Sequence, residues 1–410
     1  MTEDPPASAA APSKRLASID AYRGIVMFLM LAEVMELASL ALAYPESKIA
    51  SWIAFHTEHV AWTGCSLHDM IQPSFSFLVG VALPFSLASR LRRGDSRLSM
   101  ATHAFTRSVI LIFLGIALRS LGHSTTYFFF EDTLTQIGLG YFVLYLVSGF
   151  SLGVQLAISG LVLLSYWQLF ALWPLPDVAF SWSAVGVPPD WPHRLDGFAA
   201  HWNKNMNPAW YFDTWFMNLF PREEPYQYSK GGYCTLNFIP TFVTMLLGVI
   251  AGKVLRESST TSESEAATHE YSVALGTLLS AGVALAFSGW LLDYFGLCPI
   301  VKRIWTPAWT LYSGGLCFLA LAALHWVCDV RGWKAWATPV LIIGANSIVA
   351  YVMSWTLESP IKAFWLRHLG ESPFQIAGRE WEGILLGGTV LLTMWLVLWW
   401  LKRNRVFVRI

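Results

Sequence analysis

Repeated apolar runs of about twenty residues constrain this 410-residue chain more than any other feature of its sequence. A run of that length can cross the hydrocarbon core of a bilayer as a helix. Hydrophobic residues make up 55% of the chain and charged residues 13%, which is about half the charged share of a soluble protein. The sequence therefore predicts an all-α fold, a polytopic membrane helical bundle whose environment is the lipid bilayer.

About ten transmembrane helices can be placed by length and apolarity. The nearly continuous apolar run 134–173 is too long for one crossing, so we divide it near residues 148–153. The predicted spans are residues 20–43, 68–89, 105–121, 135–150, 152–173, 235–254, 273–295, 308–328, 338–357 and 384–401.

Basic residues between the spans indicate the orientation. Lys and Arg number 15 on the side of both termini and 7 on the other side, when the long segment 174–234 is left out. Cytoplasmic loops carry the excess of Lys and Arg. We therefore expect both termini in the cytoplasm and an aromatic-rich extracytoplasmic loop domain at 174–234.

Composition also suggests how the chain is organised. Residues 1–15 are rich in Ala, Pro and Ser and lack the basic region of a signal peptide, so we predict a disordered cytoplasmic tail. Residues 16–410 are predicted to form a single membrane-embedded domain. Within it, the segment 256–272, rich in Ser, Thr and Glu, is predicted to be a flexible cytoplasmic loop.

Charge and cysteine content exclude several classes of function. Basic and acidic residues number 27 each, so no overall positive field favours nucleic acid, and we expect no nucleic-acid partner. The five cysteines have neither the spacing of a zinc site nor that of a disulfide framework. We expect no metal cofactor.

Ionisable residues in the first predicted span are costly in a bilayer and suggest a pair or a function. Asp20 and Arg23 are three residues apart on one helical face, and they form either an ion pair that locks the bundle or a contact to a phosphate-bearing ligand. Glu33 and Glu36 share a face roughly 20 Å further along the helix. They are predicted either to hydrogen bond within the bundle or to face a polar cavity.

The densest catalytic chemistry lies between residues 56 and 69. His56, His59 and His68 occur there with Glu58 and Asp69, in the loop after the first predicted span and at the start of the second. A histidine with a neighbouring carboxylate can act as a general base, because the carboxylate orients the imidazole. We predict His59 as the catalytic residue and Asp69 as its orienting partner.

Two asparagines lie in later apolar segments. Asn237 and Asn346 are either packing residues that bond across helices or donors to the oxyanion of a reacting thioester. Small residues surround Asn346 in Gly344–Ser347 and favour close helix packing.

Several motifs resemble one family, the membrane acetyltransferases related to heparan-alpha-glucosaminide N-acetyltransferase. Residues 15–24 are similar to its R-x-x-S-x-D-x-x-R-G opening, and His59, Trp62 and Gly64 resemble its H-x-x-W-x-G motif. Residues 69–80 resemble D-L-x-x-P-x-F-x-F-x-x-G, 135–138 its L-Q-R-L-G element, and 344–351 its G-x-N-S-I-x-x-Y motif. Val34 stands where animal members have an Asn proposed to act in catalysis, so the neighbouring Glu33 is the candidate for that role.

The resemblance implies acetyl-CoA as co-substrate and, in the animal enzyme, a glycan amine as acceptor. We accordingly predict a membrane N- or O-acetyltransferase that moves acetyl from cytoplasmic acetyl-CoA to a small-molecule or glycan acceptor outside. His59, Asp69, Glu33 and Asn346 are the predicted catalytic residues, and Arg23, Asp20, Gln136 and Asn237 the predicted cofactor-binding residues.

The predicted location is a bacterial inner (plasma) membrane, and a homodimer is a possible assembly. The alternative function is a proton-coupled permease or lipid-linked-sugar flippase, in which buried carboxylates carry protons. The absence of a visible internal repeat weighs against transport.

Overall fold

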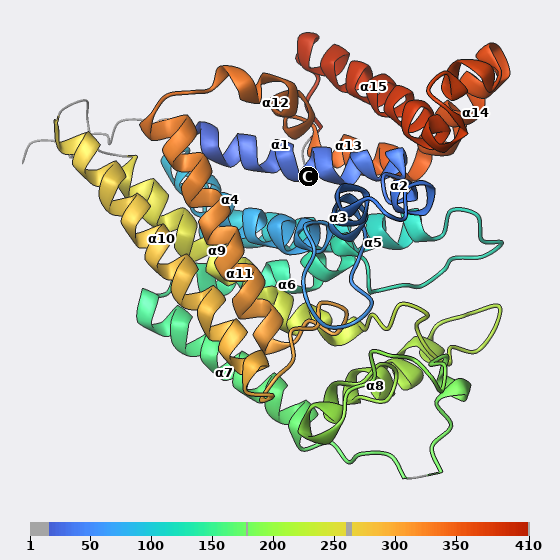
Figure 1. Cartoon of the computed structure of the whole chain (residues 1–410). Helices are drawn as coiled ribbons and strands as arrows, with labels where there is room; N and C mark the ends of the chain where they lie inside the picture. The colour runs from blue at the N-terminus through green and yellow to red at the C-terminus, as the bar shows by residue number, and fades with distance from the viewer. Residues whose placement is uncertain (1–15, 178, 260–264, 409–410) are drawn as a thin grey trace, which may run out of the picture.

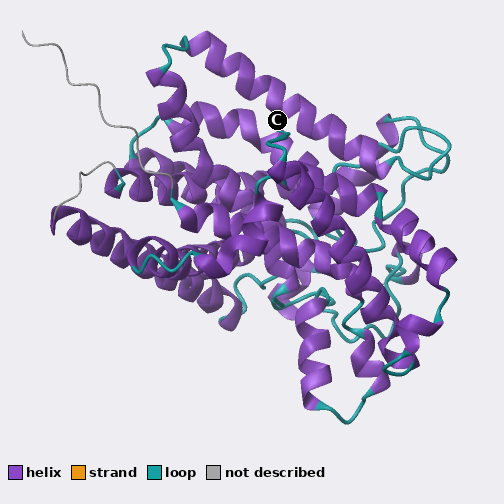
Figure 2. Cartoon of the chain, turned by 90° about the horizontal axis from the view of Figure 1, so that it is seen from above, coloured by secondary structure: helices purple, strands orange, loops and turns teal. Residues whose placement is uncertain are grey.

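The computed structural model describes residues 16–177, 179–259 and 265–408. In these ranges the regular structure is helical, and the only β-type pairing is an isolated bridge between Thr63 and Val301. The predicted all-α fold is confirmed (Figure 2). The tail predicted at residues 1–15 lies outside the described residues.

Figure 1 labels most of the α-helices. They are α1 (Ala17–Leu31), α2 (Ser39–Ala43), α3 (Lys48–Thr57), α4 (Ile71–Arg92), α5 (Arg97–Arg119), α6 (Thr133–Ser148), α7 (Leu152–Ala171), α8 (Pro208–Phe216), α9 (Phe238–Ser258), α10 (Glu265–Tyr294), α11 (Pro307–His325), α12 (Thr338–Gly344), α13 (Ser347–Thr356), α14 (Glu358–Leu369) and α15 (Glu382–Arg403).

The described residues contain seven helices long and apolar enough to cross a membrane, formed around α4, α5, α7, α9, α10, α11 and α15. The pair α12–α13, bent by 64°, brings the number to eight if it counts as one broken span. The predicted number of about ten is not confirmed. The other two predicted spans correspond to α1 and α6, which have 15 and 16 residues. Helices of that length reach only about 22–24 Å of a core about 30 Å thick.

The first predicted span, 20–43, is interrupted. Helix α1 ends at Leu31, a 3₁₀ turn covers Ala32–Met35, and Glu36 has a left-handed backbone with φ of 50°. A left-handed residue cannot continue a right-handed helix. Glu33 therefore lies in the turn that closes α1 and not inside a continuous membrane helix.

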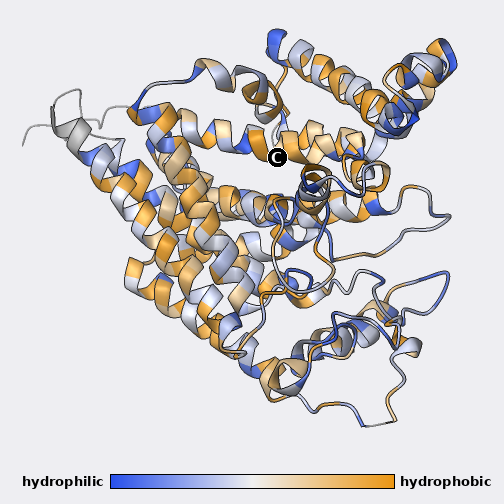
Figure 3. Ribbon diagram, in the orientation of Figure 1, coloured by the Kyte–Doolittle hydropathy of each residue, from blue (hydrophilic) through white to orange (hydrophobic). Residues whose placement is uncertain are grey.

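Helix α9 is the centre of the bundle. In its most apolar 18-residue stretch 72% of the residues are buried, compared with 17% in the corresponding stretch of α10. Figure 3 shows the hydrophobic residues that α10 and α11 carry along their length. Helix α1 crosses α12 at Gly24, where a Cβ atom would lie 2.2 Å from the carbonyl oxygen of Val340. The glycine of the D-x-x-R-G motif is therefore required by close helix packing.

An aromatic cluster joins the loops at the α8 end of the bundle. Trp62, Trp202, Trp305 and Trp309 are buried in one hydrophobic group, and Nε1 of Trp62 donates to the carbonyl of Trp202 at 3.1 Å. At the opposite end, α9 continues to Ser258 and α10 begins at Glu265. The ends of the predicted flexible loop 256–272 are thus helical, and residues 260–264 lie outside the described residues.

Candidate active site

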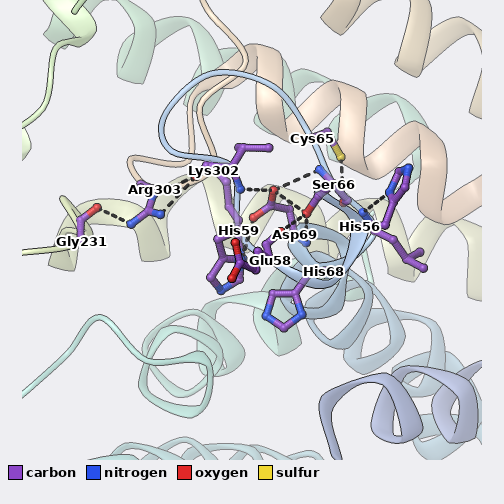
Figure 4. A network of polar contacts seen from close by, with 12 residues as sticks. His56, Glu58, His59, Cys65, Ser66, His68, Asp69, Gly231, Lys302 and Arg303 are labelled. Atoms are coloured by element: carbon purple, nitrogen blue, oxygen red, sulfur yellow. Dashed lines mark hydrogen bonds and ion pairs between the residues drawn. The ribbon is translucent and has the colours of Figure 1, made fainter. Parts of the chain in front are cut away.

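A short backbone contact assembles the site from two distant loops. The amide of Gly64 donates to the carbonyl of Ile300 at 2.9 Å, beside the bridge between Thr63 and Val301. Gly64 has φ of 108°, a conformation that glycine adopts at little cost. This contact places Lys302, which follows the bridge, against the 58–69 segment (Figure 4).

Arg303 fastens the same two loops. Its guanidinium donates to the carbonyl of Val60 at 3.2 Å through Nη2 and to the carbonyl of Gly231 at 2.8 Å through Nη1 (Figure 4). It also lies over the ring of Tyr233. Arg303 therefore ties the loop that carries His59 to its own loop and to the segment that carries Gly231.

Asp69 is the hub of the polar network. Its side chain is 1% exposed, and Oδ2 accepts from the amides of Val60 and Ser66 at 3.2 and 3.1 Å and from Oγ of Ser66 at 3.0 Å. Its other oxygen, Oδ1, lies 2.8 Å from Nδ1 of His59 and 3.3 Å from Nζ of Lys302. The carboxylate thus holds its own loop together and also contacts the imidazole of His59 and the ammonium group of Lys302.

The imidazole of His59 is oriented through one nitrogen. Asp69 and Lys302 both approach Nδ1, at 2.8 and 3.1 Å. Nδ1 can serve only one of these groups: it donates to the carboxylate if it carries the proton, and it accepts from the ammonium group if it does not. The shorter contact is to Asp69, which favours the tautomer with the proton on Nδ1 and the lone pair on Nε2. Burial lowers the pKa of His59, and the charges of Lys302 and Arg303 lower it further, although Asp69 opposes them. The ring is therefore neutral at pH 7.

The neighbouring groups of the 56–69 segment have other contacts. The ring of His68 stands edge-on to that of His59, with 4.3 Å between centroids, and its Nε2 lies 3.5 Å from Glu33. His56 accepts a hydrogen bond from the amide of Leu67. Burial raises the pKa of the Cys65 thiol to about 12, so this cysteine is not a thiolate at neutral pH.

His59 lies where two hollows meet. The first, here the reaction cavity, has a volume of about 400 Å³, and its wall includes Lys302, Arg119 and Glu131. The second, here the α1–α3 groove, has a volume of about 920 Å³ and lies between the end of α1 and helices α2 and α3. The two hollows share four wall residues, namely Glu33, His59, His68 and Ile71.

A third hollow extends from the reaction cavity toward the middle of the bundle. This basic cavity, of about 340 Å³, is lined by Arg23 and Arg107. It shares three wall residues with the reaction cavity: Phe75, Thr133 and Tyr351. The two cavities are therefore neighbours, with the arginine pair on the wall of one and His59 on the wall of the other.

Arg107, one of the two arginines, is held against Tyr141. Its Nη1 donates to the hydroxyl of Tyr141 at 3.1 Å and the guanidinium lies over the same ring, while its buried Nε has no hydrogen-bond partner. Arg23 lies 3.7 Å from Asp20, one helical turn away. A guanidinium with an unused donor beside a cavity suits a phosphate oxygen.

Three residues predicted at the site have other contacts. The side-chain amide of Asn346 bonds the C-terminal segment, with Nδ2 donating to the carbonyl of Val406 and Oδ1 accepting from the amide of Val408, both at 3.0 Å. Gln136 donates to the carbonyl of Thr235. Asn237 donates to the carbonyl of Arg303 at 2.8 Å. Neither Asn346, Gln136 nor Asn237 lines any of the three hollows.

Lys302 and Arg107 were not among the residues predicted at the site. Lys302 is 3% exposed and belongs to the Val301–Trp305 stretch between two apolar helices. Two adjacent basic residues between buried hydrophobic ones are the sequence signal that could have identified it. From the sequence, Arg107 is only one of the basic residues that indicate the orientation.

Comparison with known proteins gives two relatives and no matching protein-family model. Heparan-alpha-glucosaminide N-acetyltransferase of Homo sapiens is 24% identical over 385 residues, covering 86% of this chain and 54% of that protein. The protein of the same name from Mus musculus is 24% identical over 386 residues, covering 86% and 55%. The chain thus spans about half the length of these relatives. It is a distant relative of that family and a multi-pass membrane protein.

Proposed function

We propose that this protein transfers an acetyl group from acetyl-CoA to an amine or hydroxyl of a glycan or other sugar-containing acceptor. The observation that carries the proposal is the position of His59, which lines both the α1–α3 groove and a reaction cavity that adjoins the basic cavity of Arg23 and Arg107. The names of the two distant relatives supply the reaction class.

The basic cavity is the part of the protein that suits acetyl-CoA. Arg23 and Arg107 would bind phosphate oxygens, and the adjoining reaction cavity would receive the thioester. With both termini in the cytoplasm, as the charge asymmetry indicates, the arginines face the compartment that contains acetyl-CoA. The acceptor then approaches His59 from the extracytoplasmic side, in a bacterial inner membrane.

The chemistry follows from the free nitrogen of His59. In direct transfer, the acceptor nitrogen or oxygen attacks the acetyl carbon, its proton passes to Nε2, the C–S bond breaks, and the proton then reaches the CoA sulfur. In two-step transfer, Nε2 attacks the acetyl carbon, the C–S bond breaks and CoA leaves as the thiolate. The acceptor then attacks the same carbon, the bond between that carbon and Nε2 breaks, and the acceptor's proton is released to the imidazole or the thiolate. Nζ of Lys302 lines the same cavity and would stabilise the oxyanion in either route.

Glu33 and Glu131 supply acceptors on the cavity wall for the hydrogen atoms of an incoming amine or hydroxyl. Oε1 of Glu131 is buried and has no hydrogen-bond partner among the residues that the structure describes, and burial raises the pKa of this carboxyl well above its usual value.

The direct test is to incubate purified protein with radiolabelled acetyl-CoA, with and without amino sugars. Transfer, hydrolysis or self-labelling that disappears in His59→Ala supports the proposal. Protein that neither binds CoA nor releases labelled product overturns it and leaves transport as the remaining function.

A further inference from the structure

The α1–α3 groove is not used by the acetyl donor, and its walls change character along its length. At one end it reaches His59, His68 and Glu58. Most of the remaining wall is apolar, with contributions from Phe28 of α1 and Leu42 of α2. A hollow with a largely apolar wall and polar groups beside the reacting group suits an amphiphile better than a fully polar sugar chain.

The surroundings of the groove place it beside lipid. Leu42 is 87% exposed, although it is a large hydrophobic residue on the groove wall. Helix α3 also presents Ile49, Trp52 and Phe55 outward on one face, while Ala54 faces the groove. Short helices with an exposed apolar face and a tryptophan lie at the boundary between lipid and water.

The position along the bundle agrees with this. Figure 1 shows α2 and α3 next to the C-terminal end of α1, at the end of the bundle where α4 begins. The α4 span starts at His68, so the polar end of the groove lies level with the end of a membrane helix and Phe28, on α1, lies deeper. A chain that enters beside Phe28 would keep its head group next to His59.

Charge limits the head group. Three carboxylates line the groove, those of Glu33, Glu36 and Glu58, and the described residues contribute no Lys or Arg to its wall. Lys362 pairs with Glu36 at 3.1 Å from outside the wall. Glu36 is thereby balanced, but an anionic phosphate head would still meet the carboxylates of Glu33 and Glu58, which a neutral or cationic head tolerates better.

We infer that the acceptor is a lipid-anchored molecule whose hydrocarbon chain occupies the α1–α3 groove and whose neutral or cationic head presents an amine or hydroxyl to His59. The inference rests on the proposed acetyl transfer and adds the class of acceptor. The acceptor atom gains acetyl and loses one proton, which His59 takes.

The test compares methyl, octyl and dodecyl glycosides of an amino sugar as acceptors, with the protein in nanodiscs. The test variant is Ala41→Trp, which should fill the groove because Ala41 lines it. The control is Ala43→Trp on the same helix, because Ala43 does not line the groove. In wild type and Ala43→Trp, kcat/KM should rise by about tenfold or more from methyl to octyl. In Ala41→Trp the ratio should fall toward one.

Bilayer partitioning of the longer glycosides would raise the rate equally in both variants, so an equal gain in Ala41→Trp and Ala43→Trp overturns the inference. Inhibition by dodecyltrimethylammonium should exceed that by dodecyl phosphate, and the reverse order also overturns it.

A readout without catalysis separates this inference from the proposed function. A diazirine-bearing alkyltrimethylammonium probe should label α1–α3 in wild type and Ala43→Trp, and at least about fivefold less in Ala41→Trp. If no acceptor is acetylated but this labelling pattern holds, the proposed function fails and the groove remains a lipid site. If the probe does not label α1–α3, the inference fails whatever the transfer assay gives. A second copy of the chain packed on α3 would give that result.

Discussion

Nζ of Lys302 lies 3.1 Å from Nδ1 of His59, although 243 residues separate the two in sequence. A buried ammonium group at that distance disfavours a second positive charge on the imidazole. It therefore keeps His59 in the neutral form, in which Nε2 can accept a proton or attack a carbonyl.

The first prediction concerns the pH dependence of transfer. The neutral imidazole is the reactive form, so kcat/KM should fall as protonation sets in at low pH. Because the folded pKa of His59 is lowered from 6.5, this fall should lie below pH 6.5 in wild type. Lys302→Met removes one cause of the lowering and should move the acid limb to higher pH. Lys204→Met is the control and should leave the pH profile unchanged, because Nζ of Lys204 donates to the carbonyl of Lys230. An unchanged acid limb in Lys302→Met would contradict the assignment of His59 as the titrating group.

The second prediction concerns His59 itself. His59→Ala should reduce transfer about 10²–10⁴-fold, the usual loss for a general base. CoA-dependent stabilisation should remain, because Arg23 and Arg107 lie in a different cavity. If acetyl is carried covalently, wild-type protein should gain an acid- and base-labile label from acetyl-CoA alone. His193→Ala, an exposed histidine of the 174–234 segment, is the control. Retention of near-normal transfer in His59→Ala, with loss in His68→Ala, would reassign the base.

The pairing of His59 with Asp69 could be anticipated from sequence because both residues lie within one loop. Their contact is present at 2.8 Å, while their catalytic roles remain predictions. Lys302 could not be placed beside them, since a bridge between Thr63 and Val301, 238 residues apart in sequence, determines that contact. Local spacing carries no information on such a pairing.

The asparagines show a different limit. A polar residue in an apolar run must find a partner, but the sequence does not distinguish a ligand from backbone. Asn346 and Asn237 each bond main-chain groups of distant segments. The count of about ten spans is not confirmed, since the described residues contain seven or eight helices long and apolar enough to cross a membrane. In the first predicted span, the apolar sequence continues past Glu36, but the left-handed backbone of Glu36 prevents one continuous helix.

The third prediction concerns Asp69. Asp69→Asn leaves Lys302 without its buried carboxylate partner and disturbs the acceptor for the amides of Val60 and Ser66. Removing one member of a buried pair typically costs about 3–5 kcal/mol, so the variant should melt at a clearly lower temperature. Transfer should also fall, because the imidazole loses its orienting group. Glu58→Gln, at an exposed position of the same loop, should change the melting temperature little. Equal melting temperatures for wild type and Asp69→Asn would refute the hub role.

The fourth prediction concerns the basic cavity. CoA at a hundredfold excess over its dissociation constant should stabilise the solubilised protein by about 2.7 kcal/mol. Arg107→Ala should weaken binding about tenfold, which at the same CoA concentration reduces the stabilisation to about 1.4 kcal/mol. Arg93→Ala, an exposed position just past α4, is the matched control. An undiminished CoA effect in Arg107→Ala would place the phosphates elsewhere.

The last prediction concerns orientation, and the native cysteines make it practicable. Four of the five are buried, and the thiol of the fifth, Cys65, has its pKa raised to about 12, so native thiols should react little with maleimide. A cysteine introduced at Ser262 lies on the side where Lys and Arg are in excess, and one at Ser183 lies in the 174–234 segment. With both termini in the cytoplasm, a membrane-impermeant maleimide should label Ser183→Cys in intact cells and Ser262→Cys only after permeabilisation. The opposite pattern would invert the topology and place the basic cavity on the wrong side for cytoplasmic acetyl-CoA.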